Sequence, residues 1–239
     1  MGWASAVAYL RLKSAARWAA RLALLVSPLF LNACLITAPG VYFASSDFVQ
    51  PKVLSGVWQS APAEGTDKTA EVSYLQVKPV ENGLHRATPL FKDGRIDVNN
   101  DTVDFGVVDL GSGNYVVATT ETEGDGTKSE FLGLKAEEDK LTLIRFDGGG
   151  LNNANQVAFA QALSQNDLSR DASDKGDTRL AGVVTKDKIK ALFTALMADP
   201  AQYGGNVTVY TKAVGIVVKQ PPKLAAKPRH KHRRRHRHH

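Results

Sequence analysis

The sequence of 239 residues has one cysteine, two methionines and no acidic residue in either its first 33 or its last 21 positions. A single cysteine excludes an internal disulfide framework, so a folded domain must be held together by its apolar core. The sequence also lacks a long apolar run, because the run from Leu22 to Leu31 is shorter than the roughly 20 residues of a membrane-spanning helix. Such a run instead has the length of the apolar part of a secretory signal.

The N-terminal segment leads to the lone cysteine. Four basic residues between positions 11 and 21 precede the apolar run, which continues into Leu31-Asn32-Ala33-Cys34. These four residues resemble the lipobox of bacterial lipoproteins, in which a peptidase cuts before the cysteine and the thiol carries a diacylglycerol. The resemblance implies that residues 1–33 are a signal peptide and that Cys34 is the lipidated first residue. Asn32 departs from the family, which usually has a small or branched residue there.

A lipid on Cys34 would hold the protein on a membrane, since several acyl chains bind much more strongly than one. Leu35 follows the cysteine where many enterobacterial inner-membrane lipoproteins have aspartate. The family's sorting rule therefore implies the outer membrane, with the protein facing the periplasm. Alternatives stay open, because an acid-free, alanine-rich N-terminus is also typical of an organelle transit peptide, an ordinary signal peptide or a short anchor.

Charge is segregated along the chain, so the whole-chain value of +6 describes none of its parts. Of the 30 basic residues, four lie in residues 1–33 and nine in residues 219–239, while all 24 acidic residues lie between these ends. The body therefore has 17 basic residues and a net charge of −7. An acidic domain is followed by a tail of charge +9.

The tail, residues 219–239, is expected to be disordered, because it has three prolines and few apolar side chains to bury. Lysine and arginine bind phosphate and carboxylate groups, which in a cell envelope belong to lipopolysaccharide, peptidoglycan and anionic lipids. Nucleic acid would bind by the same chemistry in vitro but is not the expected partner in the cell. The residues expected to contact polyanions are Lys227, Arg229, Lys231, Arg233, Arg234, Arg235 and Arg237.

Five of the six histidines also lie in the tail, between positions 230 and 239. Protonation below about pH 6.5 would add to the nine positive charges and strengthen polyanion binding. The same imidazoles could instead chelate Zn, Ni or Cu, although the neighbouring guanidinium groups repel a metal cation. A tail that is solvated or docked on the body is the third interpretation. We expect no bound metal and no cofactor.

Residues 54–218 are expected to form a single β-rich domain, preceded by a tether at residues 34–53. Seven segments rich in Val, Leu, Thr, Phe and Tyr are separated by turn residues such as Asn82-Gly83 and Gly111-Ser112-Gly113. This pattern predicts a mainly β fold, an antiparallel meander that forms a sheet or a partly closed barrel. The segments are 55–60, 71–80, 84–91, 102–110, 114–121, 129–136 and 140–146.

One or two helices and a final strand are expected after the meander. Residues 151–163 predict a helix with a modest apolar stripe that includes Val157, and residues 166–179 predict a polar loop. Thr185 is a plausible N-cap of a second helix, which Pro200 ends. This helix should pack on the sheet before a strand at 206–211. Its apolar face consists of Ile189, Leu192, Phe193, Leu196 and Met197.

Gly56-Val57-Trp58 opens the expected strands, and a helix and then a strand close them. This motif and this order resemble lipocalins, whose motif near the first strand is Gly-x-Trp and whose barrels hold apolar ligands. The resemblance covers three residues and an approximate element order. It implies a carrier of a small apolar ligand, with a sizeable cavity beneath Trp58.

Motifs for catalysis or metal binding are weak in the body. His85, its one histidine, is expected on a strand surface or in a structural hydrogen bond. Asp97 to Asp101 begins like a calcium loop, but Thr102 replaces the required glycine and Val108 the bidentate glutamate, so a polar turn is expected. The sequence favours a non-enzymatic, lipid-anchored cell-envelope protein whose tail contacts polyanions. A lipocalin-like carrier is the alternative.

Overall fold

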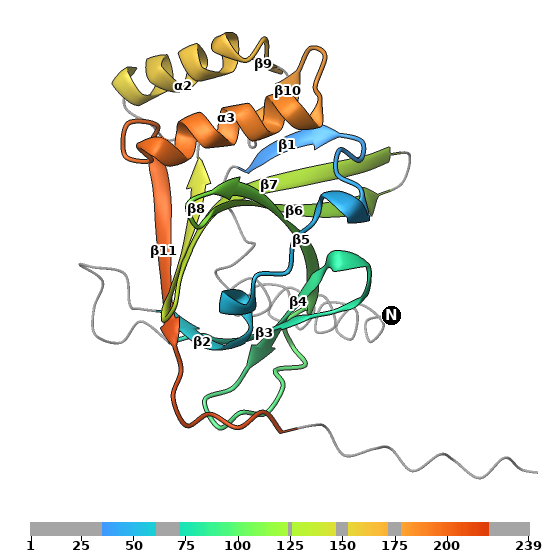
Figure 1. The fold of residues 1–239 in the computed structure, drawn as a ribbon, viewed down its shortest axis with the longest axis vertical. Coiled ribbons are helices and arrows are strands. Elements are labelled where there is room, and N and C mark those ends of the chain that lie inside the picture. Colours follow the sequence, from blue (N-terminus) through green and yellow to red (C-terminus); the bar gives the residue numbers. More distant parts are fainter. Residues whose placement is uncertain (1–34, 61–71, 124–125, 147–152, 172–177, 220–239) are drawn as a thin grey trace, which may run out of the picture.

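Eight antiparallel strands close into a barrel in the computed structural model, which describes residues 35–60, 72–123, 126–146, 153–171 and 178–219. Strands that follow one another in sequence pair with each other, and the last strand pairs with both β8 and β2 to close the ring (Figure 1). The barrel strands are β2 (Gly56–Ser60), β3 (Tyr74–Pro79), β4 (His85–Leu90), β5 (Val103–Gly111), β6 (Asn114–Glu123), β7 (Gly126–Glu137), β8 (Lys140–Phe146) and β11 (Gly205–Lys212). The expected antiparallel β fold is confirmed, and the barrel is fully closed.

Turn residues set the connections where the sequence indicated them. The β3–β4 connection is the 3-10 turn η3 (Glu81–Gly83), in which Asn82 and Gly83 have φ angles of 60° and 76°. Asparagine and glycine tolerate this left-handed region better than other residues. The β5–β6 turn likewise passes through Ser112 at φ 55° and Gly113 at φ 75°. The hairpins therefore form where local chemistry allows the chain to reverse.

Strands β5 to β8 bury side chains on both faces, which produces two cores. Successive side chains of a strand point to opposite faces. Val107, Val117 and Leu132 accordingly point into the barrel, while their neighbours Val108, Val116 and Phe131 pack outside it. The interior core consists of Leu35, Leu54, Trp58, Leu75, Val77, Ala87, Val107, Val117, Leu132, Leu134, Leu141 and Tyr210. The second core lies between the outer face of the barrel and the helices.

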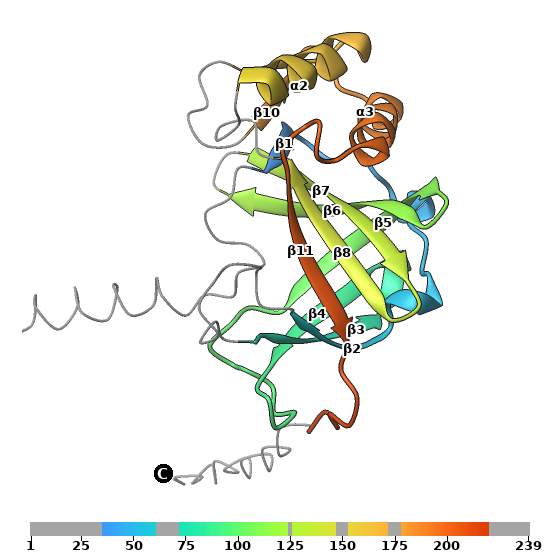
Figure 2. The same ribbon diagram turned by 90° about the vertical axis from the view of Figure 1, so that its left-hand side faces the viewer.

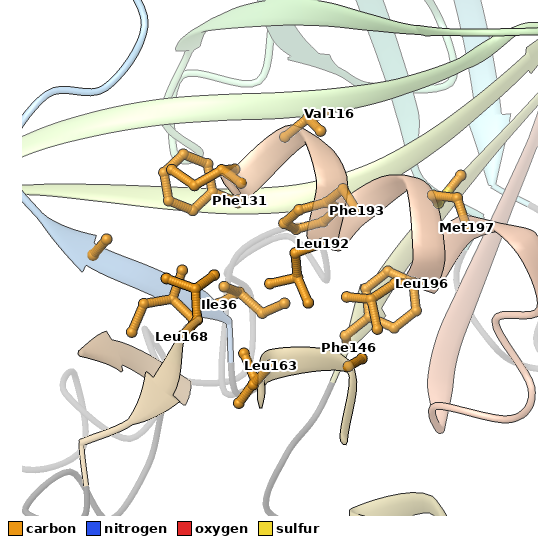
Figure 3. Packing of buried hydrophobic residues seen from close by; sticks show 14 of the residues in the cluster. Ile36, Val116, Phe131, Phe146, Leu163, Leu168, Leu192, Phe193, Leu196 and Met197 are labelled. Atoms are coloured by element: carbon orange, nitrogen blue, oxygen red, sulfur yellow. The ribbon is translucent and has the colours of Figure 1, made fainter. Parts of the chain in front are cut away.

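Helix α3 (Lys186–Ala198) covers the outer face of the barrel, and α2 (Asn153–Gln165) lies over α3 (Figures 1 and 2). The Thr185 side chain caps α3 by accepting a hydrogen bond from the backbone N–H of Lys188 at 3.3 Å. Phe193 packs edge-on between Phe131 and Phe146, at centroid distances of 6.4 and 6.0 Å (Figure 3). All five residues of the expected apolar face are buried, so this prediction is confirmed.

The prediction for α2 needs one correction. Phe159 and Leu163 of this helix are buried in the second core, but Val157 is 57% exposed and does not belong to the buried stripe. The loop expected at residues 166–179 is also only partly correct, because β9 (Ser169–Arg170) pairs with β10 (Thr178–Ala181).

The tether expected at residues 34–53 is wrong from residue 35 onward. Strand β1 (Ile36–Pro39) pairs with the first half of β7 and with β10, and Ile36 and Ala38 are buried. The chain then forms the 3-10 turns η1 (Ser45–Asp47) and η2 (Lys52–Leu54) across the barrel (Figure 1). β1 has only four residues and directly follows the apolar signal segment, so no alternation of apolar and polar residues marks it in the sequence.

The described chain begins and ends on opposite sides of the barrel. β1 lies on the helix-covered side, while the segment after β11 runs along the opposite side (Figures 1 and 2). Leu35 and Lys219 mark these two positions. In the part of the chain that the structure describes, no helix is long and apolar enough to cross a bilayer.

Candidate functional site

The barrel encloses a small apolar cavity. Its volume is about 50 Å³, and its lining comes from η2 and from every barrel strand except β2. A single water molecule needs roughly 10–15 Å³, so several non-hydrogen atoms fit. Pockets for drug-sized ligands are roughly 300–1,000 Å³. The cavity therefore suits a slender apolar group and is far smaller than the sizeable cavity beneath Trp58 that the lipocalin resemblance implies.

Trp58 holds η2 over the interior of the barrel. Its side chain is fully buried, and its Nε1–H donates to the carbonyl oxygen of Leu54 at 2.9 Å. Leu54, the last residue of η2, lines the cavity. The ammonium of Lys212 lies over the indole ring, 5.7 Å from its centre. Trp58 is thus a structural residue that positions one wall of the cavity.

His85 lies inside the barrel and has no hydrogen-bond partner in the part of the chain that the structure describes, which corrects the expectation of a surface or hydrogen-bonded position. Its side chain is fully buried and stacks on Phe105, with ring centroids 5.5 Å apart and planes inclined by 20°. Among the described residues, neither ring nitrogen has a hydrogen-bond partner. Burial lowers the pKa of His85, because the apolar surroundings disfavour the imidazolium. The ring is therefore neutral at pH 7.

Tyr210 is a second buried polar group in the barrel wall. It is 1% exposed, and burial raises the pKa of its hydroxyl to about 12. The Ser73 hydroxyl donates to that of Ser60 at 3.0 Å. Within the described chain, the Tyr210 hydroxyl has no partner at hydrogen-bonding geometry. The Tyr210 ring lines the cavity, so a bound group would contact its aromatic face or edge.

The turn at Asp97 is a self-contained polar turn, as expected. One carboxylate oxygen of Asp97 accepts from the backbone N–H of Asn99 at 3.0 Å, and the other accepts from the Asn100 side chain at 2.6 Å. In the described ranges, no three histidine, cysteine or acidic side chains are grouped to hold a metal ion. The turn supports the hairpin that follows β4.

A mixed cationic and apolar surface lies where the described chain ends. We call it the C-terminal edge and define it as residues 91–98 and 213–219. The backbone N–H of Lys219 donates to the carbonyl oxygen of Gly94 at 2.8 Å, which joins the two segments. The Arg95 guanidinium lies 5.4 Å from the Phe91 ring centre and pairs with Asp93 at 2.6 Å. Exposed apolar side chains flank these cations.

The residues predicted to be functional lie beyond the two ends of the described chain. Cys34 precedes Leu35, and Lys227, Arg229, Lys231, Arg233, Arg234, Arg235 and Arg237 follow Lys219, so all eight are outside the described residues. The structure locates only their attachment points. The sequence did not reveal Tyr210, because β11 has valines at 207 and 209 and their alternation favours the opposite face. Val207 is instead 54% exposed while Tyr210 is buried.

Comparisons with known proteins assign no family or activity to these sites. No protein-family model, no curated protein and no solved structure matches this chain.

Proposed function

We propose that this protein is a non-enzymatic, lipid-anchored cell-envelope protein. A lipid on Cys34 would hold it on the membrane, and the favoured location is the outer membrane, with the protein facing the periplasm. The cationic tail at residues 219–239 would contact envelope polyanions. The observation that carries the proposal is the placement of the two attachment points on opposite sides of the barrel (Figures 1 and 2). A lipid at one side and a cationic tail at the other suit a protein that joins two layers of an envelope.

The anchor side has a short connection to the folded domain. Leu35 is 8% exposed and belongs to the interior core, and its carbonyl oxygen accepts from the backbone N–H of Thr178 at 2.9 Å. Consecutive Cα atoms are only about 3.8 Å apart, so a lipid on Cys34 would hang directly from the barrel. The barrel would then lie against the membrane that holds the lipid.

The tail side reaches away from that membrane. Lys219 is tied to Gly94 through its backbone, so the tail starts at a fixed point of the domain. A flexible coil of the following 20 residues spans about 25 Å root-mean-square, and charge repulsion extends it further. The body has a charge of −7 and the tail one of +9, so the tail is the part suited to negatively charged partners.

Two experiments test this proposal. Intact-mass spectrometry of protein from bacterial membranes should show a chain that starts at Cys34 and carries diacylglycerol, and Cys34→Ser should abolish that mass. Retention on isolated sacculi and on lipopolysaccharide should fall when residues 220–239 are deleted. An unlipidated chain would disprove the anchor, and unchanged retention after the deletion would disprove the role of the tail.

The apolar cavity favours a second candidate function, that of a carrier for a small or slender apolar ligand. A fluorescent lipid probe should then bind at one saturable site. Val117→Phe would fill the cavity and weaken the probe, whereas Val207→Phe on the outer face of the barrel serves as the matched control. Binding that does not saturate, or that is equal in both variants, would exclude this function.

A further inference from the structure

The C-terminal edge exposes more apolar surface than its surroundings require. Val217 is 74% exposed in the segment whose end pairs with the hairpin after β4 through Lys219, and Val214 is 95% exposed three residues earlier. Phe91 at the start of that hairpin is 38% exposed, and Val98 in the turn that follows it is 82% exposed. Large apolar side chains gathered on adjoining exposed segments often mark a surface that contacts a partner or a membrane.

The cations of the edge lie beside these apolar side chains. Lys92, Arg95 and Lys219 are exposed, and the edge also holds two acidic residues, Asp93 and Asp97. The backbone N–H of Arg95 is the main cause of the lowered pKa of Asp93, and the positive charge of Lys219 adds to it. The chain continues from Lys219 into a segment with eight further basic residues and no acidic one. Positive charge therefore increases from the edge into the tail.

We propose that the C-terminal edge docks on a lipid bilayer that carries anionic phospholipid headgroups. The exposed valines and Phe91 would enter the boundary between headgroups and acyl chains, while Lys92, Arg95 and Lys219 contact phosphates. This inference rests on the proposed function and names the class of polyanion that the cationic end meets. Soluble glycans offer negative charge but no apolar layer, so they would leave the valines in water.

The C-terminal edge and the anchored end of the chain face opposite directions. The edge lies on the side of the barrel away from β1 (Figure 2). A chain anchored through Cys34 in one bilayer would therefore present the edge to a second lipid surface. The protein would tether two bilayers across its own barrel.

Vesicle tethering tests the proposal with the mature lipidated chain. The protein is placed in vesicles of neutral lipid and mixed with fluorescent vesicles that contain phosphatidylglycerol, and co-sedimentation is measured. Val214→Ser with Val217→Ser should weaken tethering about tenfold, since two partly buried side chains lose their apolar contact. Val157→Ser with Val183→Ser is the matched control, because these valines are 57% and 74% exposed on the helix side.

The outcomes separate the inference from the proposed function. Equal tethering by both double variants, with loss only when residues 220–239 are deleted, would overturn the edge and leave the tail as the polyanion site. Competition by soluble dextran sulfate as strong as that by phosphatidylglycerol vesicles would show that the partner need not be a lipid. No binding to any anionic partner would overturn both. Circular dichroism should show that the two double variants and the deletion variant are folded.

Discussion

The ring of Phe48 occupies the space that Gly106 leaves open on the outer surface of β5. A Cβ atom at position 106 would overlap three carbons of that ring. The backbone N–H of Val49 also donates to the carbonyl oxygen of Val107 at 2.8 Å. Directly before Phe48, Asp47 accepts a hydrogen bond from the Lys186 ammonium of α3 at 2.8 Å. These contacts fix residues 43–54 to the barrel and explain why they are not a tether.

Gly106→Ala should destabilise the protein, because the added methyl group displaces the Phe48 ring. Overpacking of this kind costs about 1–3 kcal/mol in the free energy of unfolding. Gly126→Ala is the control, since a Cβ there meets nothing within 4 Å. Urea unfolding should give a lower midpoint for Gly106→Ala and a nearly unchanged one for Gly126→Ala. Equal midpoints would show that the Phe48 contact does not hold the segment.

Replacing Tyr210 and replacing Tyr42 by phenylalanine should have opposite effects on stability. Tyr210→Phe removes a buried hydroxyl without a hydrogen-bond partner among the described residues, so stability should stay equal or rise. Tyr42→Phe removes a hydroxyl that donates to the Pro39 carbonyl oxygen at 2.6 Å, which should cost about 0.5–1.5 kcal/mol. Thermal unfolding of both variants measures the difference. A larger loss for Tyr210→Phe would reveal a bound water or ligand at the Tyr210 hydroxyl.

His85 should make stability fall at mildly acidic pH. Burial lowers the pKa of folded His85, whereas the unfolded chain keeps a value near 6.5. Between these two pKa values the unfolded state binds more protons than the folded state. The contribution of His85 to the free energy of unfolding is therefore fully present above about pH 6.5 and decreases as the pH falls below that value. The slope contributed by one proton is at most about 1.4 kcal/mol per pH unit.

His85→Phe keeps an aromatic ring against Phe105 and should flatten this slope. Urea unfolding at several pH values between about 6.5 and 5 compares the variant with the natural chain. Parallel curves would assign the pH dependence to other groups. Tyr210→Phe, which changes no group that titrates in this range, should keep the slope of the natural chain.

The buried face of helix α3 should contribute strongly to stability, whereas its exposed face should not. Leu192 is fully buried between the helix and the barrel, so Leu192→Ala should cost about 2–5 kcal/mol. Thr194 is exposed on the same helix, and Thr194→Ala should change stability by less than about 0.5 kcal/mol. Chemical unfolding of the two variants tests whether the second core is as well packed as the structure shows.

Local chemistry determined much of the fold. Alternating apolar residues and turn residues such as Asn82-Gly83 located the strands from β2 to β8, because strand periodicity and left-handed φ angles are properties of short segments. Thr185 and the apolar face around Leu192 likewise located α3. The segregation of charge and the position of Cys34 are also properties of the sequence alone, and the hypothesis of an anchored protein with a cationic tail came from them.

Tertiary structure decided how these elements close and what they enclose. Only pairing over long sequence distances makes β11 join β2, makes β1 add to β7 and places Tyr210 rather than Val207 inside. His85 is buried, contrary to the expectation, because the barrel closes around it. The cavity exists because side chains from distant strands do not fill the interior. The sequence determined where the strands and helices lie, because these depend on local interactions, and it carries the segregated charges directly. Non-local packing decided the cavity and the placement of the two chain ends on opposite sides of the domain.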